Sequence, residues 1–181
     1  MDKYQQKWTA LQNNLFRFLC LKVGQSINLR GIARELKVSP TAVSKAMEKL
    51  EKEKLIKKEK SKTMNLILIE FNRDNPKAIE NKRVENLKII YESEVLDYLH
   101  NEFLGCSIIL FGSYSLGEDT IKSDIDIAII GANKKNIDLT KYDKFLERKI
   151  SINYYKSWNE IHKHLKENIL RGIVIYGGVE L

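Results

Sequence analysis

The sequence has few cysteines and no long apolar segment, and each shortage excludes a class of protein. Among its 181 residues, only Cys20 and Cys106 are cysteines. So distant a pair indicates neither a disulfide framework nor a zinc site. No apolar run approaches the roughly 20 residues that a membrane-spanning helix needs. Residues 1–10 are polar and lack the apolar centre of a signal peptide. We therefore expect a cytoplasmic protein that has no membrane partner.

Charge is distributed unevenly along the chain, whose formal net charge is +7. Residues 1–74 contain 16 Lys and Arg against 8 Asp and Glu, a net charge of +8, whereas residues 75–181 contain 15 against 16, a net charge of −1. A basic segment followed by a near-neutral one predicts a nucleic-acid partner for the first segment alone. Lysines that merely solvate the surface would produce the same bias.

Residues 1–74 have the pattern of three helices followed by a β-hairpin. Apolar residues recur every four positions from Leu11 to Val23, which predicts an amphipathic helix that ends at Gly24. Asn28 is placed to cap a second helix, and Ser39 with Pro40 to begin a third. Two apolar segments then flank a lysine-rich turn, which indicates a hairpin.

The stretch SINLRGIARELKVSPTAVSKAMEKLEKEKLIKKE, residues 26–59, resembles the winged helix-turn-helix family. This resemblance implies that the third helix enters the major groove of double-stranded DNA, N-terminal end first. Thr41, Ser44 and Lys45 would then reach base edges. Lysines placed to contact phosphates, which give affinity rather than sequence information, are Lys49, Lys57, Lys58, Lys60 and Lys62. For Lys45 and Lys49, surface pairing with a nearby Glu is the alternative.

Two apolar segments indicate further packing. The second hairpin strand, residues 66–71, is apolar on both faces, whereas a strand open to water alternates. We expect its outer face to be covered by the second domain, a helix or another copy of the chain. Residues 76–104 then read as helical, with a break near Glu92 and Ser93. Their apolar side, from Val84 to Phe103, would pack on the second domain or on a dimer partner.

The second half contains a motif that resembles the signature of the DNA polymerase β-like nucleotidyltransferase superfamily in its minimal members. An apolar strand at residues 107–111 leads into Gly112 and Ser113, and ten residues separate this pair from Asp124-Ile125-Asp126. Ser123 also stands before the first acid, as in those members. The resemblance covers about residues 90–181. Alone, an Asp-x-Asp triplet would indicate only a turn at the end of a strand.

The chemistry of this superfamily explains the spacing. Alternate residues of a strand share a face and lie about 6.6 Å apart, so Asp124 and Asp126 can bind Mg²⁺ together. At Gly112 the backbone can approach the phosphates of ATP or another nucleoside triphosphate, because no Cβ intervenes. The resemblance implies that Ser113 and Ser123 help to hold these phosphates. Lys122 is either a further phosphate contact or an ordinary surface charge.

One element of the superfamily pattern is missing from the sequence. Its members usually carry a third carboxylate on a later strand, and residues 149–155 form the candidate strand. The acid is expected at Ser151 or Asn153, and neither residue is acidic. Residues of the preceding segment that could substitute are Asp138, Asp143 and Glu147. After this strand, we expect a helix over residues 158–170, a terminal strand and no metal-binding role for His100, His162 or His164.

Together these patterns predict an α+β protein. We expect a winged helix-turn-helix domain of three helices and a hairpin (residues 1–74), a helical connector (75–104) and a nucleotidyltransferase α/β domain with a small mixed sheet (105–181). One hypothesis is an Mg²⁺-dependent enzyme that transfers AMP to a protein or nucleic-acid hydroxyl, serving as an antitoxin that modifies a HEPN-type toxin protein. The alternative is a transcription regulator, a homodimer by expectation, whose second domain binds nucleotide or dimerises without catalysis.

Overall fold

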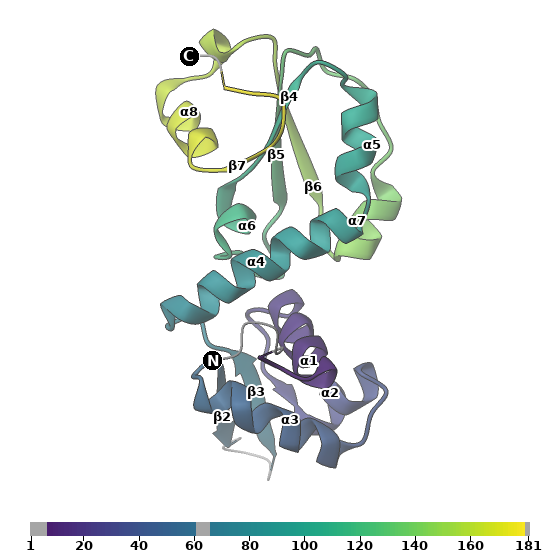
Figure 1. The fold of residues 1–181 in the computed structure, drawn as a ribbon, viewed down its shortest axis with the longest axis vertical. Coiled ribbons are helices and arrows are strands. Elements are labelled where there is room, and N and C mark those ends of the chain that lie inside the picture. The colour runs from purple at the N-terminus through teal and green to yellow at the C-terminus, as the bar shows by residue number, and fades with distance from the viewer. Residues whose placement is uncertain (1–6, 61–65, 180–181) are drawn as a thin grey trace. The chain divides into compact units, whose positions relative to one another are not determined.

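The computed structural model describes residues 7–60 and 66–179 and divides the chain into two compact units, residues 1–82 and 83–181 (Figure 1). Across this described part, every helix is too short or too polar to cross a membrane. The division expected from the sequence, at residues 74 and 104, stays a prediction.

The first unit has the predicted winged helix-turn-helix architecture. Asn28 caps α2 by accepting a hydrogen bond from the Gly31 N–H at 2.8 Å. Ser39 caps α3 in the same way by accepting from the Ala42 N–H at 3.1 Å. Strand β3 lies between β1 and β2 and is antiparallel to both. The elements of this unit are α1 (Ala10–Leu21), β1 (Ile27–Asn28), α2 (Leu29–Glu35), α3 (Pro40–Lys52), β2 (Ile56–Lys60), β3 (Ile67–Phe71) and the start of α4 (Pro76–Glu92).

One face of strand β3 enters the core of the first unit and becomes exposed toward the start of the strand. Ile69 and Phe71 are buried in a core shared with the three helices, whereas Ile67 is 52% exposed. Leu68 and Glu70, which lie on the other face of the strand, are half-buried, so that face is partly covered within the chain. Cover by another copy of the chain stays a prediction.

The second unit is built on a four-stranded mixed sheet of order β6-β5-β4-β7 (Figure 1). Strands β5 and β6 are parallel, and the other neighbours are antiparallel, as the predicted mixed sheet requires. The elements that begin within this unit are α5 (Val95–Glu102), β4 (Ser107–Phe111), α6 (Gly112–Leu116), β5 (Ile125–Ile130), α7 (Thr140–Leu146), β6 (Ile150–Tyr155), the 3₁₀ helix η1 (Trp158–Glu160), α8 (Lys163–Leu170) and β7 (Ile173–Tyr176).

Helix α4 contributes to both units. Its residue Ala78 is fully buried in the core of the first unit, and Ile89 and Ile90 are buried in the part that belongs to the second. The predicted break is confirmed, because Glu94 has a left-handed φ of +62° between α4 and α5. Val84 and Tyr91 of the expected apolar side are 69% and 49% exposed, so the chain itself leaves them uncovered.

One prediction for the end of the chain needs correction. The helix expected over residues 158–170 is a 3₁₀ turn followed by α8, with Ile161 extended between them. Apolar residues spaced by three or four positions suit both arrangements, so periodicity did not separate them. Helix α7 was not predicted. His100 stacks on Tyr176 with ring centroids 4.0 Å apart.

Candidate nucleotide site and DNA-binding surface

Gly112 and Asp126 face each other at one end of the sheet. Strands β4 and β5 pair Phe111 with Asp126, so the turn that follows β4 begins beside this carboxylate. Gly112 has φ +72°, and a Cβ at this position would stand 2.6 Å from Asp126 Oδ2. The positive φ favours glycine at this bend, and a side chain there would also require the Asp126 carboxylate to turn away.

Asp124 and Asp126 bring two negative charges to this bend. Asp124 is exposed immediately before β5, and Asp126 is half-buried as the second residue of the strand. Burial raises the pKa of Asp126, and the nearby Asp124 carboxylate raises it further. The intervening Ile125 is fully buried. A cation bound between the two carboxylates would relieve the repulsion that this arrangement creates.

Local hydrogen bonds fix the bend and the loop that leads to the two acids. The Ser115 hydroxyl donates to the Gly112 carbonyl at 2.8 Å, and the Glu118 N–H donates to the Ser113 carbonyl at 2.9 Å. The Ser123 hydroxyl accepts from the Thr120 N–H at 3.0 Å, so Ser123 closes the turn before Asp124. Lys122 is exposed on this turn.

Ser151 occupies the position beside Asp126. In the parallel pairing of β5 and β6, Ser151 is the partner of Asp126 and Asn153 is the partner of Ala128. Paired residues on neighbouring strands project from the same face of a sheet. The place where a third carboxylate is expected from the sequence therefore carries a hydroxyl.

The acids that were considered as substitutes have local roles. Asp138 accepts from the Thr140 N–H at the start of α7, and Asp143 accepts from the Ile150 N–H at the start of β6, each at 2.9 Å. Glu147 is exposed with a left-handed φ of +52°. Within residues 7–60 and 66–179, the structure holds no group of three His, Cys, Asp or Glu that could bind a metal ion.

A buried polar cluster behind the bend was not predicted from the sequence. Asn86 on α4 donates to Asp119 Oδ1 at 2.7 Å, and Arg148 lies 3.7 Å from the other oxygen of that carboxylate. All three side chains are buried. One signal was available: Asn86 lies three and four residues before Ile89 and Ile90, on the inward face of the helix.

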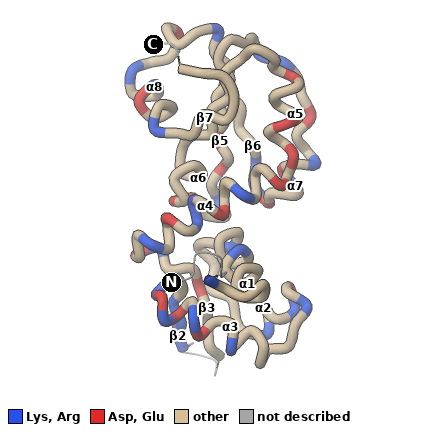
Figure 2. Tube along the Cα trace, in the orientation of Figure 1, with Lys and Arg blue, Asp and Glu red and all other residues tan. Residues whose placement is uncertain are grey.

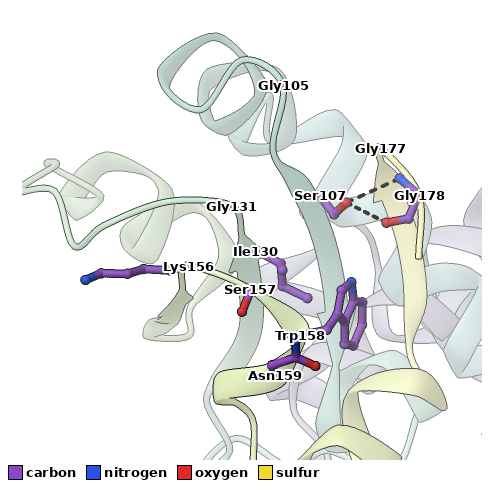
Figure 3. A pocket seen from close by; sticks show the side chains of 10 residues that line it. All are labelled: Gly105, Ser107, Ile130, Gly131, Lys156, Ser157, Trp158, Asn159, Gly177 and Gly178. Atoms are coloured by element: carbon purple, nitrogen blue, oxygen red, sulfur yellow. Dashed lines mark hydrogen bonds between the residues drawn. The ribbon is translucent and has the colours of Figure 1, made fainter. Parts of the chain in front are cut away.

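The second unit also has a cavity at the other end of its sheet, with a volume of about 440 Å³ (Figure 3). It is lined by Ser107, which begins β4, and by Ile130, which pairs with Ser107 at the end of β5. Figure 3 shows Ser107 joined by hydrogen bonds to Gly178 at its rim. Strand β4 runs from Ser107 at this cavity to Phe111 beside Asp126, so the cavity and the acid lie at opposite ends of the strand. No residue predicted for the nucleotide site lines the cavity.

Helix α3 presents the residues that were expected to read DNA. Thr41, Ser44 and Lys45 are exposed in its first half. The opposite face is buried, where Val43, Met47 and Leu50 pack in the core. The predicted outward and inward positions of this helix are therefore separated as amphipathic periodicity requires.

The predicted phosphate-contacting lysines differ in their partners. Lys49 donates to the Lys7 carbonyl, Lys57 pairs with Asp74, and Lys58 pairs with Glu51. Lys60 is exposed at the end of β2. Lys62 lies outside the described residues. Figure 2 shows acidic residues interleaved with the basic ones around β2.

Both halves of the chain match known families. Residues 15–63 match the MarR family, and residues 92–176 match the family described as nucleotidyltransferase domain. No curated protein matches the chain.

Solved structures similar to the chain include two of ZitR from Lactococcus lactis. The structure titled as a zinc-responsive MarR family member is 24% identical, with 58% of this chain and 69% of that chain covered and a TM-score of 0.39. The wild-type protein in complex with DNA is 25% identical, with 57% and 67% covered and a TM-score of 0.41. The adhesin competence repressor AdcR from Streptococcus pyogenes is 21% identical, with 55% and 70% covered and a TM-score of 0.43.

Proposed function

Because the chain joins a MarR-type winged helix-turn-helix to a nucleotidyltransferase domain, we propose that it is a DNA-binding protein with a nucleotide-dependent second activity. That activity is the transfer of a nucleotidyl group, AMP in the case of ATP, to a hydroxyl of a protein or nucleic acid. The DNA-binding half regulates transcription, and the modified partner is a separate chain. A HEPN-type toxin is the partner that we propose.

The observation that carries this proposal is the contact between Gly112 and Asp126. The triphosphate of a nucleotide needs a backbone that it can approach closely. A Cβ at residue 112 would lie 2.6 Å from Oδ2 of Asp126, the carboxylate proposed to bind the metal. Asp124 and Asp126 are the residues that would hold Mg²⁺, since hard cations take carboxylate oxygens. When bound, Mg²⁺ would neutralise part of the triphosphate charge. Ser113 would hold the terminal phosphates.

The reaction is an in-line displacement at the α-phosphorus. The acceptor hydroxyl oxygen forms a new bond to this phosphorus, the bond to the β-phosphate oxygen breaks, and pyrophosphate leaves. The hydroxyl proton passes to water, because Ser151 has no carboxylate to accept it. The contribution of the chain is to position the triphosphate against Gly112 and Ser113 and to hold the metal charge at Asp124 and Asp126.

Labelled ATP tests the proposed transfer. The full-length protein is incubated with Mg²⁺, the products of neighbouring genes and ATP labelled in either its α- or its γ-phosphate. We expect the α label alone to become covalently attached to an acceptor, and we expect Asp124→Ala to abolish this attachment. Asp138→Ala is the matched control, because it removes a carboxylate whose partner is the Thr140 N–H at the start of α7. Attachment of the γ label, or label transfer that survives Asp124→Ala, would contradict nucleotidyl transfer.

A second candidate function is favoured by Ser151. With a hydroxyl beside Asp126 in place of a carboxylate, the domain would bind the magnesium nucleotide without turning it over. The protein would then be a transcription regulator that responds to nucleotide. The expected result is ATP binding that changes the affinity for duplex DNA, with no label transfer to any acceptor. DNA affinity that is the same with and without saturating ATP would contradict this candidate.

A further inference from the structure

The helix that carries the Gly112–Ser113 bend is held in place by side chains of α4. Helix α6 has five residues, and so short a helix has little stability of its own. Asn86 donates to the Tyr114 carbonyl at 2.9 Å, and Arg83 donates to the Ser115 carbonyl at 2.9 Å. These carbonyls belong to the end of a helix, where backbone partners are few, and the Tyr114 carbonyl also accepts from the Gly117 N–H at 3.2 Å. Helix α4 therefore adds two hydrogen bonds to those that α6 makes itself.

The same amide of Asn86 connects α6 to the start of β6. It donates to Asp119, whose carboxylate lies 3.7 Å from Arg148. Asn86, Asp119 and Arg148 are 3%, 1% and 6% exposed, so water competes little for these bonds. Arg148 stands just before Lys149, whose carbonyl accepts from the Ile125 N–H at 2.8 Å between the two aspartates. The buried cluster is thus connected both to the helix after Gly112 and to the segment that pairs with Ile125.

Helix α4 also belongs to the core of the first unit. It runs without interruption from Pro76 to Glu92, while the division between the units falls after Lys82. Ala78 is fully buried in the core that contains the helices of the first unit, and Ile79 packs against the same core. One helix therefore carries both the residue that binds α6 and residues that stabilise the DNA-binding unit.

We propose that Asn86 and Asp119 are positioning residues that couple occupancy of the nucleotide site to the first turns of α4, and through them to the DNA-binding unit. The inference rests on the proposed nucleotide binding. A triphosphate that orders the Gly112–Ser113 bend orders α6. Because Asn86 binds α6 and Asp119 together, α4 becomes more stable, including its residues 76–82. Nucleotide and DNA would then influence each other's affinity reciprocally.

Hydrogen–deuterium exchange of the full-length protein, with and without ATP and Mg²⁺, tests this coupling. We expect ATP to slow exchange at residues 112–126 and also at residues 76–82. In Asn86→Leu, saturating ATP should still protect residues 112–126 but no longer residues 76–82. The affinity for ATP should fall roughly tenfold, as expected when a buried hydrogen bond is lost. Asn81→Leu is the matched control, because the Asn81 amide donates to the Lys77 carbonyl of the same helix.

The outcomes separate the coupling from the proposed function. Absence of protection at residues 112–126 in the wild type would overturn nucleotide binding and the coupling with it. Protection at residues 112–126 without protection at 76–82 would overturn the coupling alone, as would an unchanged response in Asn86→Leu. If Asn86→Leu does not fold, Asp119→Asn replaces it, because it keeps the side-chain size and removes the charge that faces Arg148. The same loss of protection at residues 76–82 is expected of it.

Discussion

Gly112 stands so close to Asp126 that a single methyl group would lie 2.6 Å from the carboxylate oxygen Oδ2. Gly105 offers a matched comparison, since its φ of +79° is similar but a Cβ there meets no atom within 4 Å. Comparing alanine variants at Gly112 and Gly105 separates the effect of a left-handed backbone from the effect of crowding by Asp126.

We predict that Gly112→Ala and Gly105→Ala will each destabilise the protein by about 1–2 kcal/mol, because both residues adopt a left-handed conformation. Only Gly112→Ala should also abolish binding of ATP in the presence of Mg²⁺. Thermal unfolding and calorimetric titration with ATP measure the two effects. Equal ATP affinities in the two variants would show that the crowding at residue 112 has no bearing on nucleotide binding.

The raised pKa of Asp126 predicts that its charged carboxylate lowers the stability of the metal-free protein at neutral pH. A carboxyl whose pKa is raised on folding stabilises the protein most below its unfolded value of 3.8, and this contribution is lost as pH rises through the folded pKa. Asp126→Asn should therefore raise the melting temperature at pH 7 in the presence of a chelator. The advantage should shrink as pH falls toward 3.8, where the wild-type carboxyl becomes neutral as well.

The same variant should lose the stabilisation that Mg²⁺ gives to the wild type, because an amide is a weaker ligand for a hard cation. Melting temperatures measured over a series of Mg²⁺ concentrations check this effect. A variant that is less stable than the wild type without metal would contradict the repulsion between Asp124 and Asp126.

The register of β5 and β6 predicts that Ser151→Asp will strengthen metal binding. The new carboxylate would lie beside Asp126, so the metal-free protein should become less stable and the increase in stability on adding Mg²⁺ should become larger. If the wild type transfers label from α-labelled ATP, the variant should transfer it faster. Asn153→Asp is the control, because its partner is Ala128 rather than an acid. Equal responses of the two variants to Mg²⁺ would argue against a metal position at Asp126.

The partners of the basic residues predict unequal roles in DNA binding. Lys45→Ala should weaken duplex binding by at least about 1 kcal/mol, because its exposed position on α3 suits contact with base edges. Lys60→Ala should lower the dependence of log Kd on log salt by about 1, as expected for one phosphate contact.

Lys57→Ala should change both quantities less, since the Lys57 ammonium already pairs with Asp74. Fluorescence anisotropy of a labelled duplex at several salt concentrations gives both the affinity and the slope. A larger loss of affinity for Lys57→Ala than for Lys60→Ala would indicate that the ion pair opens on the DNA.

Local patterns were sufficient where neighbouring residues determine the structure. The cap at Ser39 and the proline that follows it placed the start of α3, and the apolar run at residues 107–111 gave β4 its observed bounds. The strand with Ser151 was also placed correctly, which identified the residue beside Asp126 before its partner strand was known.

Contacts between distant parts of the chain could not be paired in this way, even where one partner carried a signal. Asn86 and Asp119 are 33 residues apart, and nothing local to either residue names the other as its partner. Lys57 and Lys58 looked available in the sequence because the carboxylates that pair with them come from α3 and from the turn after β3. Sequence patterns specify which groups are present, but tertiary structure decides which of them are already neutralised.

The sharing of α4 has a practical consequence for dissection of the protein. A polypeptide that stops at residue 74 would leave a hole where Ala78 fills the first core, and one that starts at residue 93 would lose the Asn86 amide from the second unit. Proteolytic nicking anywhere in this helix should harm both halves at once. We therefore expect each half to keep its full set of contacts only when its own part of α4 stays attached.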